Sequence, residues 1–445
     1  MLSLKPSGAM ETLQNRFAEA AAMSMKLPGV VLALLVGVIL LLLFIIWSIT
    51  RHRAPTLRIE AQGSLPELIR SLSGLSLGTP IAGNHVQIFE NGAFFDVLLE
   101  EVATAQHSVH FETFLWKDGE LSRRVTEVLC GRAHAGVTVR VLVDAAGASK
   151  MGKQTEQRLR GAGCKVTRFH PRTFPNIGVV NQRDHRKIVV VDGRTAFVAG
   201  HCIVDCWLGH GQDRNHWRDI GVRLRGPAVH ALQSVFSENW VEETGELFAG
   251  DEVFPPLEQH GDVLVHVAHA KPQHSAPAVK ILHHAIICCA QKRLWIQNPY
   301  FIPEPEAIEA YGRAVERGVD VRVMVPSADV SDMPIVQHAA HRNFEKLLAC
   351  GVRIFENSKT LLHQKVMTVD RAWCAVGSTN FDDRAFEIND EVTVGMLDPK
   401  LARELELIFE RDLEDCVEVR LEKWSRRSAF HKLKDHFFYL FNEQL

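Results

Sequence analysis

The sequence has no excess of charge of one sign and few cysteines. Across 445 residues, 50 Lys and Arg oppose 53 Asp and Glu, which gives a formal net charge of -3. This balance argues against generic nucleic-acid binding through bulk positive charge and leaves room only for a local basic pocket. The 9 cysteines are odd in number and follow no framework spacing. We therefore expect them to be reduced and buried, in a domain that faces a reducing compartment.

The sequence also gives little support for a metal site. The suggestive cluster is Cys288–Cys289, close to His283–His284, in the stretch ILHHAIICCAQ. That stretch has the pattern of an apolar helix, on which adjacent cysteines cannot point the same way. We expect core packing there, and we predict neither a metal nor a cofactor.

One long uncharged run stands out in a chain whose composition, 46% hydrophobic and 23% charged, is that of a folded protein. Residues 29–49 carry no charge, and at 1.5 Å per residue a helix of this length spans about 30 Å, the thickness of a bilayer core. No small-residue cleavage site follows, so a single membrane anchor is favoured over a signal peptide. Three arginines follow the run and two basic residues precede it, which places the C-terminal part in the cytoplasm by the positive-inside rule.

The remainder of the chain is organised as two similar halves. AHAGVTVRVLVD (133–144) resembles VERGVDVRVMVP (315–326), and in both a helical stretch ends at a glycine before a β-branched strand. Alternating helices and strands predict an α/β fold with a mixed sheet flanked by helices in each half, related by pseudo-two-fold symmetry. The expected parts are a tail (1–28), a transmembrane helix (29–49), a linker (50–85), a first domain (86–250), a second domain (251–415) and a C-terminal amphipathic helix (416–445).

Each half carries the same three residue types at the same spacing, in DHRKIVVVDG (184–193) and LLHQKVMTVD (361–370). Strand alternation places the histidine and the lysine of each motif on one face. A lysine can hold phosphate oxygens, and a histidine can attack phosphorus or transfer a proton. Two facing motifs therefore suit a two-step phosphoryl transfer through a phosphohistidine, without a metal. The predicted catalytic residues are His185, Lys187, Asp192, His363, Lys365 and Asp370.

From about Gly92 to Glu391 these motifs resemble the phospholipase D superfamily. GSTNFDDRAFEINDE (377–391), IQNPYFIPE (296–304), WRDIGVRLRGPAV (217–229) and HFETFLW (110–116) are similar to segments of its bacterial cardiolipin synthase subgroup. The resemblance implies duplicated phospholipase D-like domains and a protein of the bacterial inner membrane, with a single span and a cytoplasmic catalytic part.

The resemblance also implies individual roles. Ser378 and Asn380 match residues that help to bind the phosphate. Glu391 matches the acid that accepts a hydrogen bond from His363, and Asp219 resembles its counterpart for His185. The motif aspartates, although part of the predicted catalytic set, are expected to brace the structure rather than to contact phosphorus. By family analogy His185 is the nucleophile and His363 the acid and base.

The first half departs from the family pattern in AGHC. Here Gly200 aligns with Ser378, and Cys202 aligns with Asn380, where an asparagine is usual. Because a thiol is a weak hydrogen-bond donor, either the phosphate is held asymmetrically or His201 supplies the missing donor.

The function implied by the resemblance is transfer of a phosphatidyl group from phosphatidylglycerol to a second phospholipid alcohol, with release of glycerol. That alcohol is expected to belong to another phosphatidylglycerol, with phosphatidylethanolamine as a further candidate. A phospholipase D-type hydrolase that forms phosphatidic acid is the alternative, followed by a nuclease and then a non-enzymatic scaffold. The predicted partners are phospholipids and the membrane, without nucleic acid, and the oligomeric state is left open.

The C-terminal stretch KWSRRSAFHKLKDHFFYLFNEQL (423–445) has a helical apolar pattern. It is expected to place one set of side chains on one face, opposite Arg and Lys: Trp424, Phe430, Leu433, Phe437, Leu440 and Phe441. Such a helix either lies on anionic lipid or docks on the body, and periodicity does not distinguish the two.

Overall fold

The computed structural model describes residues 16, 29, 31–44, 65–73, 78–171, 173, 176, 179, 181–271 and 277–440. The chain divides into two compact units, residues 1–55 and 56–445. In the first unit, residue 29 and residues 31–44 are helical. No helix within the described residues is both long enough and apolar enough to cross a membrane. The predicted tail, apart from residue 16, and residues 30 and 45–49 of the predicted span lie outside the described residues.

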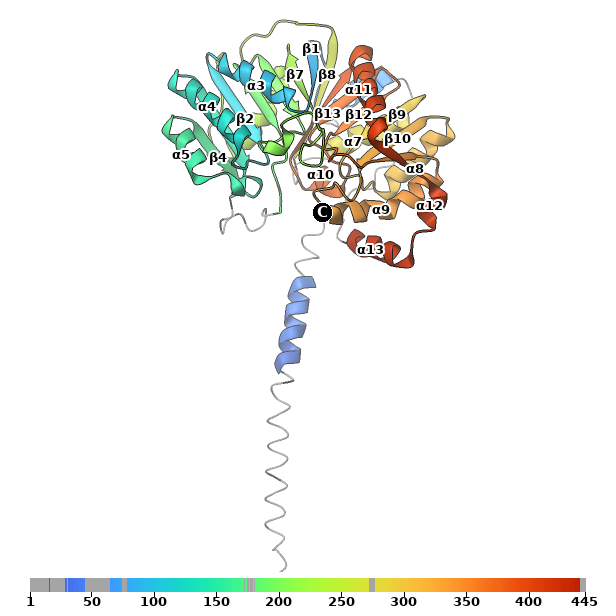
Figure 1. Ribbon diagram of the computed structural model, residues 1–445. Helices are drawn as coiled ribbons and strands as arrows, with labels where there is room; N and C mark the ends of the chain where they lie inside the picture. Colours follow the sequence, from blue (N-terminus) through green and yellow to red (C-terminus); the bar gives the residue numbers. More distant parts are fainter. Residues whose placement is uncertain are drawn as a thin grey trace, which may run out of the picture. The chain divides into compact units, whose positions relative to one another are not determined.

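The second unit is built around one 15-stranded mixed sheet, drawn in Figure 1. The strands of the first half are β1 (Ile81–Glu90), β2 (Ser108–Thr113), β3 (Thr138–Asp144), β4 (Lys165–Phe169), β5 (Ile188–Val191), β6 (Thr195–Ala199) and β7 (Ile220–Arg225). Those of the second half are β8 (Val263–Ala270), β9 (Arg293–Gln297), β10 (Asp320–Pro326), β11 (Arg353–Asn357), β12 (Val366–Val369), β13 (Trp373–Gly377), β14 (Glu391–Leu397) and β15 (Cys416–Val419).

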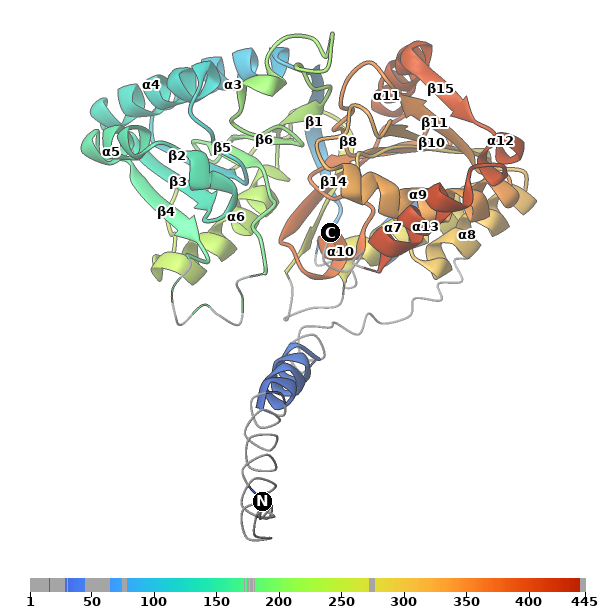
Figure 2. The same ribbon diagram turned by 60° about the horizontal axis from the view of Figure 1, so that its bottom comes forward.

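Helices cover both faces of this sheet. They are α2 (Leu65–Ser71), α3 (Ala93–Ala103), α4 (Glu120–His134), α5 (Lys153–Gly161), α6 (Val229–Thr244), α7 (Ala278–Cys289), α8 (Pro305–Glu316), α9 (Pro334–Ala349), α10 (Asp383–Glu387), α11 (Pro399–Asp412), α12 (Leu421–Ser425) and α13 (Ala429–Tyr439). Figures 1 and 2 show α3, α4 and α5 beside the strands of the first half, and α7, α8 and α9 beside those of the second.

The predicted duplication is confirmed, but the two halves share a single sheet. The strand order is β15-β11-β10-β9-β12-β13-β14-β8-β1-β7-β6-β5-β2-β3-β4, which repeats the same arrangement from both ends apart from the extra β15. The halves join where β1 and β8 pair antiparallel. This pairing removes two edges that would otherwise be exposed. α6 and α11 then share one apolar core with strands of both halves, so that the two domains form one continuous body.

The helix–glycine–strand units take the predicted form. Gly136 and Gly318 have φ values of +90° and +89°, directly after α4 and α8. A left-handed residue at this position ends a helix and is favoured by glycine. The two parallel strands that follow, β3 and β10, then carry the chain into corresponding places in the sheet.

Three sequence predictions need correction or support. The segment 50–85, predicted to be a linker, contains α2 and the start of β1, because the apolar side chains of α2 pack into the core beside α7. The segment 416–445 is not one helix but β15, α12 and α13, and its residues 441–445 lie outside the described residues. Core packing around Cys288–Cys289 is confirmed: α7 is buried along most of its length, and all nine cysteines are free.

Candidate active site

The two predicted His-x-Lys segments lie at matching positions, immediately before β5 and β12. The intervening residues point the other way, as strand alternation predicts. Arg186 donates to carbonyl oxygens of Val235 and Ala270, and Gln364 donates to Asp412. Each motif thereby turns its histidine and lysine to one side and anchors its middle residue on the other.

The backbone of each motif histidine is held by the opposite half. The N–H of His185 donates to the carbonyl oxygen of Asp390 at 3.0 Å, and the N–H of His363 donates to that of Arg218 at 2.7 Å. The adjacent bridges pair Asp184 with Asp390 and Arg218 with Leu362. The two motifs therefore meet across the seam between the halves.

The carboxylates that orient the histidines also cross this seam, so the pairing predicted from sequence is wrong. Nδ1 of His185 lies 2.7 Å from Oε1 of Glu391, and Nδ1 of His363 lies 2.8 Å from Oδ2 of Asp219. The prediction assigned each acid to the histidine of its own half. The exchange follows from the backbone bridges, because Glu391 comes directly after Asp390 and Asp219 directly after Arg218. A proton shared at Nδ1 leaves Nε2 of each ring for chemistry.

The four charged and polar groups of the two motifs form one electrostatic cluster. Burial lowers the pKa of His185 well below its usual value, and the cations Lys187 and Lys365 lower it further. Burial and the same two lysines lower the pKa of His363. Both rings are therefore neutral at neutral pH, which is the state in which an imidazole attacks an electrophile.

The two lysines differ in their surroundings. Burial lowers the pKa of Lys187 and brings that of Lys365 to about 7. Lys187 donates to the carbonyl oxygen of His185 and lies over the ring of Phe114. Nζ of Lys365 lies 2.9 Å from both ring nitrogens of His363. A buried cation pair of this kind is suited to an anion, because negative charge would offset the mutual repulsion of the lysines.

The pKa of Lys365 leads to a prediction for the pH dependence of the free protein. The ammonium is lost above pH about 7, whereas an exposed lysine keeps its charge to about pH 10.4. We expect kcat/KM to fall as pH rises through 7, and Lys365→Arg to shift this decline to higher pH because guanidinium stays charged. A pH–rate profile of both proteins checks this, and an unchanged limb in the variant would show that another group titrates. The free energy of unfolding has the opposite pH dependence. It rises between about pH 7 and 10.5, because in this range Lys365 is protonated in the unfolded chain and neutral in the folded protein.

The motif aspartates brace the fold, as the sequence predicted, and do not belong to the cluster of histidines. The carboxylate of Asp192 accepts three bonds from the backbone N–H groups of residues 106–108, at 2.7 to 2.9 Å. Asp370 accepts the same three from residues 291–293, also at 2.7 to 2.9 Å. These bonds tie the far end of β5 and β12 to the start of β2 and β9. Asp192 and Asp370 are thus positioning residues rather than members of the catalytic set.

Ser378 and Gly200 explain how the two acids are held differently. The hydroxyl of Ser378 donates to Oε2 of Glu391 and accepts from the N–H of Val392 at 3.1 Å. In the first half glycine leaves space for Asp219, which instead accepts from Nε1 of Trp207 at 2.9 Å. Trp207 thus takes the place of Ser378 as the side-chain donor to the acid. The sequence did not identify Trp207, because it lies seven positions after Gly200, the residue that aligns with Ser378. A role for Ser378 in phosphate binding stays a prediction.

Substitution of this glycine has a specific expected cost. A Cβ at Gly200 would lie 2.6 Å from Oδ2 of Asp219, so Gly200→Ala must displace the carboxylate that orients His363. We expect turnover to fall by about 10- to 100-fold, the range for a lost charged hydrogen bond. Gly131→Ala is the matched control, because its Cβ meets no atom within 4 Å and its site lies within α4. The control should keep full activity and gain about 0.5–1 kcal/mol in stability; equal losses in both variants would contradict the prediction.

Asn380 and Cys202 occupy corresponding buried positions. Oδ1 of Asn380 is buried without a hydrogen-bond partner among the described residues. Cys202 lies close enough to interact electrostatically with Lys187 and Lys365. His201 does not take over the missing donor: its Nε2 lies 3.0 Å from the carbonyl oxygen of Asn91, and its ring stacks on Phe94 in the core. Of the two possibilities raised by the sequence, asymmetric phosphate contacts are favoured.

Aromatic rings and one arginine complete the surroundings of the histidines. Phe114 meets His185 edge-on at 4.9 Å between ring centroids, and Trp217 stacks on His363 at 5.6 Å. Arg384 of α10 lies close enough to lower the pKa of His185. Trp217 and Arg384 fall within the segments WRDIGVRLRGPAV and GSTNFDDRAFEINDE, which was the available sequence signal.

Comparisons with known proteins find a family model and relatives that match both halves of the chain. A family model described as cardiolipin synthase, PLD-like domain, matches residues 98–204 and 284–413. Cardiolipin synthase 2 of Bacillus anthracis is 34% identical over 76% of this chain, which spans 66% of that protein. The cardiolipin synthase of Halalkalibacterium halodurans is 32% identical over 84% of this chain and 75% of its own length. The cardiolipin synthase of Staphylococcus aureus (strain Mu50) is 32% identical over 79% of this chain and 72% of its own length.

Solved structures share the fold at low sequence identity. Phosphatidylserine synthase of Haemophilus influenzae Rd KW20 has a TM-score of 0.63 and 12% identity, covering 84% of this chain and 99% of its own. Polyphosphate kinase of Porphyromonas gingivalis has a TM-score of 0.51 and 15% identity, and the match covers 84% of this chain and 52% of the kinase chain. At these identities the likeness concerns the fold alone.

Proposed function

The chain belongs to the family of cardiolipin synthases built from phospholipase D-like domains, and we propose from this that it is a phosphatidyltransferase that forms cardiolipin. The observation that carries the proposal is the buried meeting of two histidines and two lysines, with each ring oriented by a carboxylate from the other half. Its substrates are two phospholipids, of which the donor is phosphatidylglycerol.

In the first step, Nε2 of His185 attacks the phosphorus of phosphatidylglycerol. His363 is neutral in the free protein, and the anionic phosphate of the bound lipid favours its protonated form. A P–N bond forms, the P–O bond to glycerol breaks, and the protonated His363 gives its proton to the leaving oxygen. In the second step, His363 removes the proton from the hydroxyl of the acceptor lipid. That oxygen attacks phosphorus, the P–N bond breaks, and His185 is restored. Lys187 and Lys365 hold the non-bridging oxygens as negative charge develops.

The assignment of His185 as nucleophile is supported by the differing contacts of the two rings. Nε2 of His363 lies 2.9 Å from the ammonium of Lys365. Nε2 of His185 has no hydrogen bond within the part of the chain that the structure describes. A ring nitrogen without a donor nearby keeps its lone pair for attack, whereas one beside an ammonium of pKa about 7 can exchange a proton with it.

Membrane attachment through residues 29–49 is part of the proposal. The apolar side chains of residues 31–44 are exposed on their helix, as lipid contact requires. The catalytic body then lies in the cytoplasm of a bacterial cell, in keeping with its nine free cysteines. Alkaline carbonate should leave the protein in the membrane fraction, and its release would show that it is peripheral. Protease added to intact spheroplasts should leave the catalytic body uncut, and its digestion would show that the body is exported.

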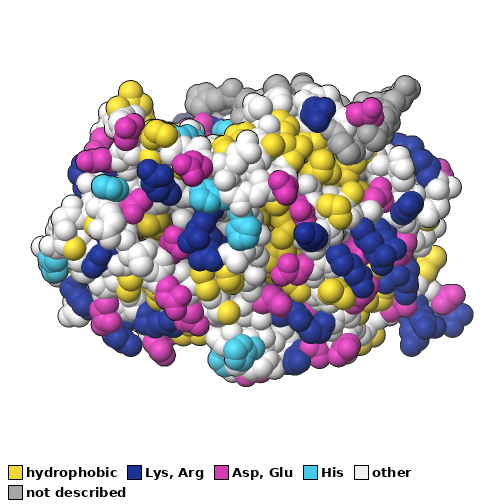
Figure 3. All heavy atoms as spheres, turned by 90° about the horizontal axis from the view of Figure 1, so that it is seen from above, with side chains coloured by type: hydrophobic (Ala, Val, Ile, Leu, Met, Phe, Trp, Pro, Cys, Tyr) yellow, Lys and Arg dark blue, Asp and Glu magenta, His cyan; other side chains and the backbone are white. Residues whose placement is uncertain are grey.

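Two other activities are less well supported. The formal net charge of -3 does not favour a nucleic acid as substrate, and Figure 3 shows positive and negative side chains interspersed on the face that is turned upward in Figure 1. A hydrolase would use the same residues with water as the acceptor, so that only the product separates it from a synthase.

Product analysis is the experiment that tests the function. The purified full-length protein is incubated with vesicles of labelled phosphatidylglycerol, with and without phosphatidylethanolamine, beside a His185→Ala control. Cardiolipin with released glycerol, absent in the control, is expected, and its dependence on phosphatidylethanolamine identifies the acceptor. Phosphatidic acid alone would mean that water is the acceptor and that the synthase assignment is wrong.

A further inference from the structure

The helix α13 exposes an apolar stripe on the surface of the body. The side chains recur at intervals of three, four and three residues, which places them on one face of a helix. Their exposed fractions are 73% for Phe430, 69% for Leu433, 55% for Phe437 and 76% for Leu440. Surface helices normally bury such a stripe, whereas all four of these side chains are more than half exposed to solvent.

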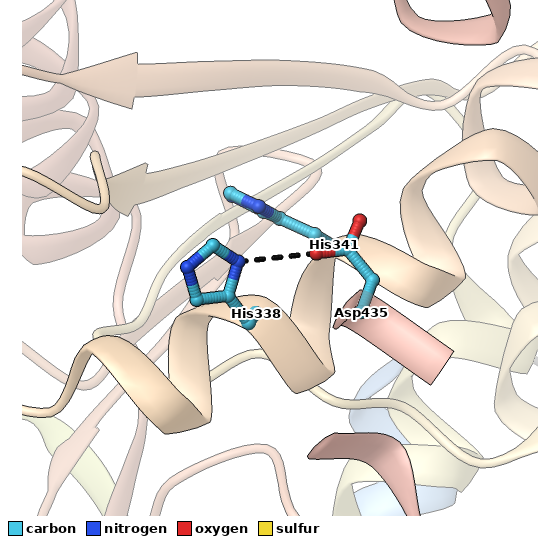
Figure 4. Close-up of side chains that lie close together, drawn as sticks. All are labelled: His338, His341 and Asp435. Carbon is cyan, nitrogen blue, oxygen red and sulfur yellow. Dashed lines mark hydrogen bonds and ion pairs between the residues drawn. The ribbon is translucent and has the colours of Figure 1, made fainter. Parts of the chain in front are cut away.

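The opposite face of α13 docks against α9 and carries Asp435, Phe438 and Tyr439. Asp435 is 2% exposed; its Oδ1 lies 3.1 Å from Nδ1 of His338, and its Oδ2 accepts from Nη1 of Arg427 at 2.8 Å. Figure 4 shows the first of these contacts. The guanidinium of Arg342 lies over the ring of Tyr439 at 3.9 Å. The ring of Phe438 stacks on His338, and Phe438 and Tyr439 pack against the core. The orientation of α13 is therefore held by polar and aromatic contacts together, while its other face stays exposed.

The cluster around Asp435 acts as this attachment rather than as a metal site. His338, His341 and Asp435 bring ligand atoms within 4.8 Å of one another. Both oxygens of Asp435 are already engaged, one of them with the cation Arg427. Nε2 of His341 lies 3.1 Å from Glu356. A positive guanidinium on the only carboxylate of the group opposes the binding of a second cation.

Positive charge accompanies the stripe. Lys423, Arg426 and Lys434 are exposed, and none of them forms an ion pair within the described residues. Lys434 lies between Phe430 and Phe437 in sequence, four residues after the one and three before the other, so it borders the stripe on the helix surface. Apolar side chains bordered by cations match a bilayer with anionic headgroups, in which the long lysine side chain reaches the headgroup level.

The helix also lies beside the element that reaches the active site. Tyr439 interacts electrostatically with Asp383, the first residue of α10, and the next residue, Arg384, influences the pKa of His185. In Figures 1 and 2, α13 and α10 lie on the same side of the body. A flat surface that contacts the exposed stripe of α13 would therefore pass close to α10.

We propose that α13 is an interfacial helix that lies on an anionic lipid surface, with Phe430, Leu433, Phe437 and Leu440 among the acyl chains. Its occupant is the bilayer, not a second protein. The inference deepens the proposed function, and rests on it in one respect: docking at α13 places α10 and the histidines close to the layer from which lipid substrates are drawn. Contact with lipid itself does not depend on turnover.

The test uses the full chain in vesicles that contain a phospholipid with a photoactivatable acyl chain. One set of vesicles combines equal amounts of phosphatidylglycerol and phosphatidylcholine, and the other contains phosphatidylcholine alone. We expect light-induced adducts in the peptide that contains α13, and several-fold fewer without the anionic lipid. The double variant Leu433→Ser/Phe437→Ser should reduce these adducts at least about tenfold, because each side chain contributes the burial of its apolar surface.

Leu247→Ser and Leu407→Ser are matched controls, because these leucines are 79% and 50% exposed but lie outside α13. They should leave labelling of α13 unchanged, and all variants should keep the thermal midpoint of the parent. Absence of adducts in α13 would overturn the proposal, as would loss of a dimer in the double variant, which would identify a second copy as the occupant. Labelling is repeated with His185→Ala, so that lipid contact without cardiolipin synthesis separates failure of the proposed function from failure of this inference.

Discussion

His185→Asn and His363→Asn are each expected to lower turnover of phosphatidylglycerol by at least about 1,000-fold, the scale of a lost nucleophile or general acid–base. The two variants should differ in which step they retain. His363→Asn keeps the nucleophile and its acid Glu391, so it can still form the phosphohistidine when the leaving group needs no proton. His185→Asn has no ring nitrogen to attack.

An aryl ester of phosphatidic acid, with nitrophenolate as the leaving group, separates these steps. Rapid mixing of His363→Asn should release a stoichiometric burst of nitrophenolate and then stall, because no base activates the acceptor. Mass spectrometry should locate the phosphatidyl group on the peptide that contains His185. A burst from His185→Asn, with the adduct on His363, would reverse the assignment of the two histidines.

The crossed carboxylates lead to the second large effect. Glu391→Gln and Asp219→Asn should each reduce overall turnover by about 100-fold or more, because an amide favours the wrong tautomer of its histidine and cannot support an imidazolium. Since Glu391 contacts His185 and Asp219 contacts His363, the two variants should impair different steps. With the aryl ester, Glu391→Gln should slow the burst, whereas Asp219→Asn should keep the burst and slow only transfer to the acceptor.

These substitutions form a matched pair, since both replace a buried carboxylate by its isosteric amide. The opposite result, a slow burst in Asp219→Asn and a normal burst in Glu391→Gln, is what pairing within each half requires. Equal slowing of both steps in both variants would mean that the carboxylates act on the structure of the site as a whole. Thermal unfolding of each variant provides the control for such a general effect.

Much of the active site could be predicted from local sequence. The residue types and spacing of the two motifs specify which side chains share a face, because strand alternation acts over two residues. The bracing role of Asp192 and Asp370 was expected with the family resemblance, but their partners were not accessible, because the backbone N–H groups that they bind lie 77 to 86 positions away in sequence. The pairing of Glu391 with His185 was not accessible, because these residues are separated by 206 positions and meet only through the bridge between Asp184 and Asp390.

The duplication, the helix–glycine–strand units and the two histidine–lysine sets could be recognised in the amino-acid sequence alone, because periodicity, turn residues and side-chain chemistry are local properties. Three further features follow from tertiary packing: one sheet runs through both halves, each half orients the histidine of the other, and α13 leaves an apolar stripe exposed. Those outcomes depend on which distant surfaces compete for burial. For α13 the bonds of Asp435 with His338 and Arg427 decide the orientation, and helical periodicity carries no information about them.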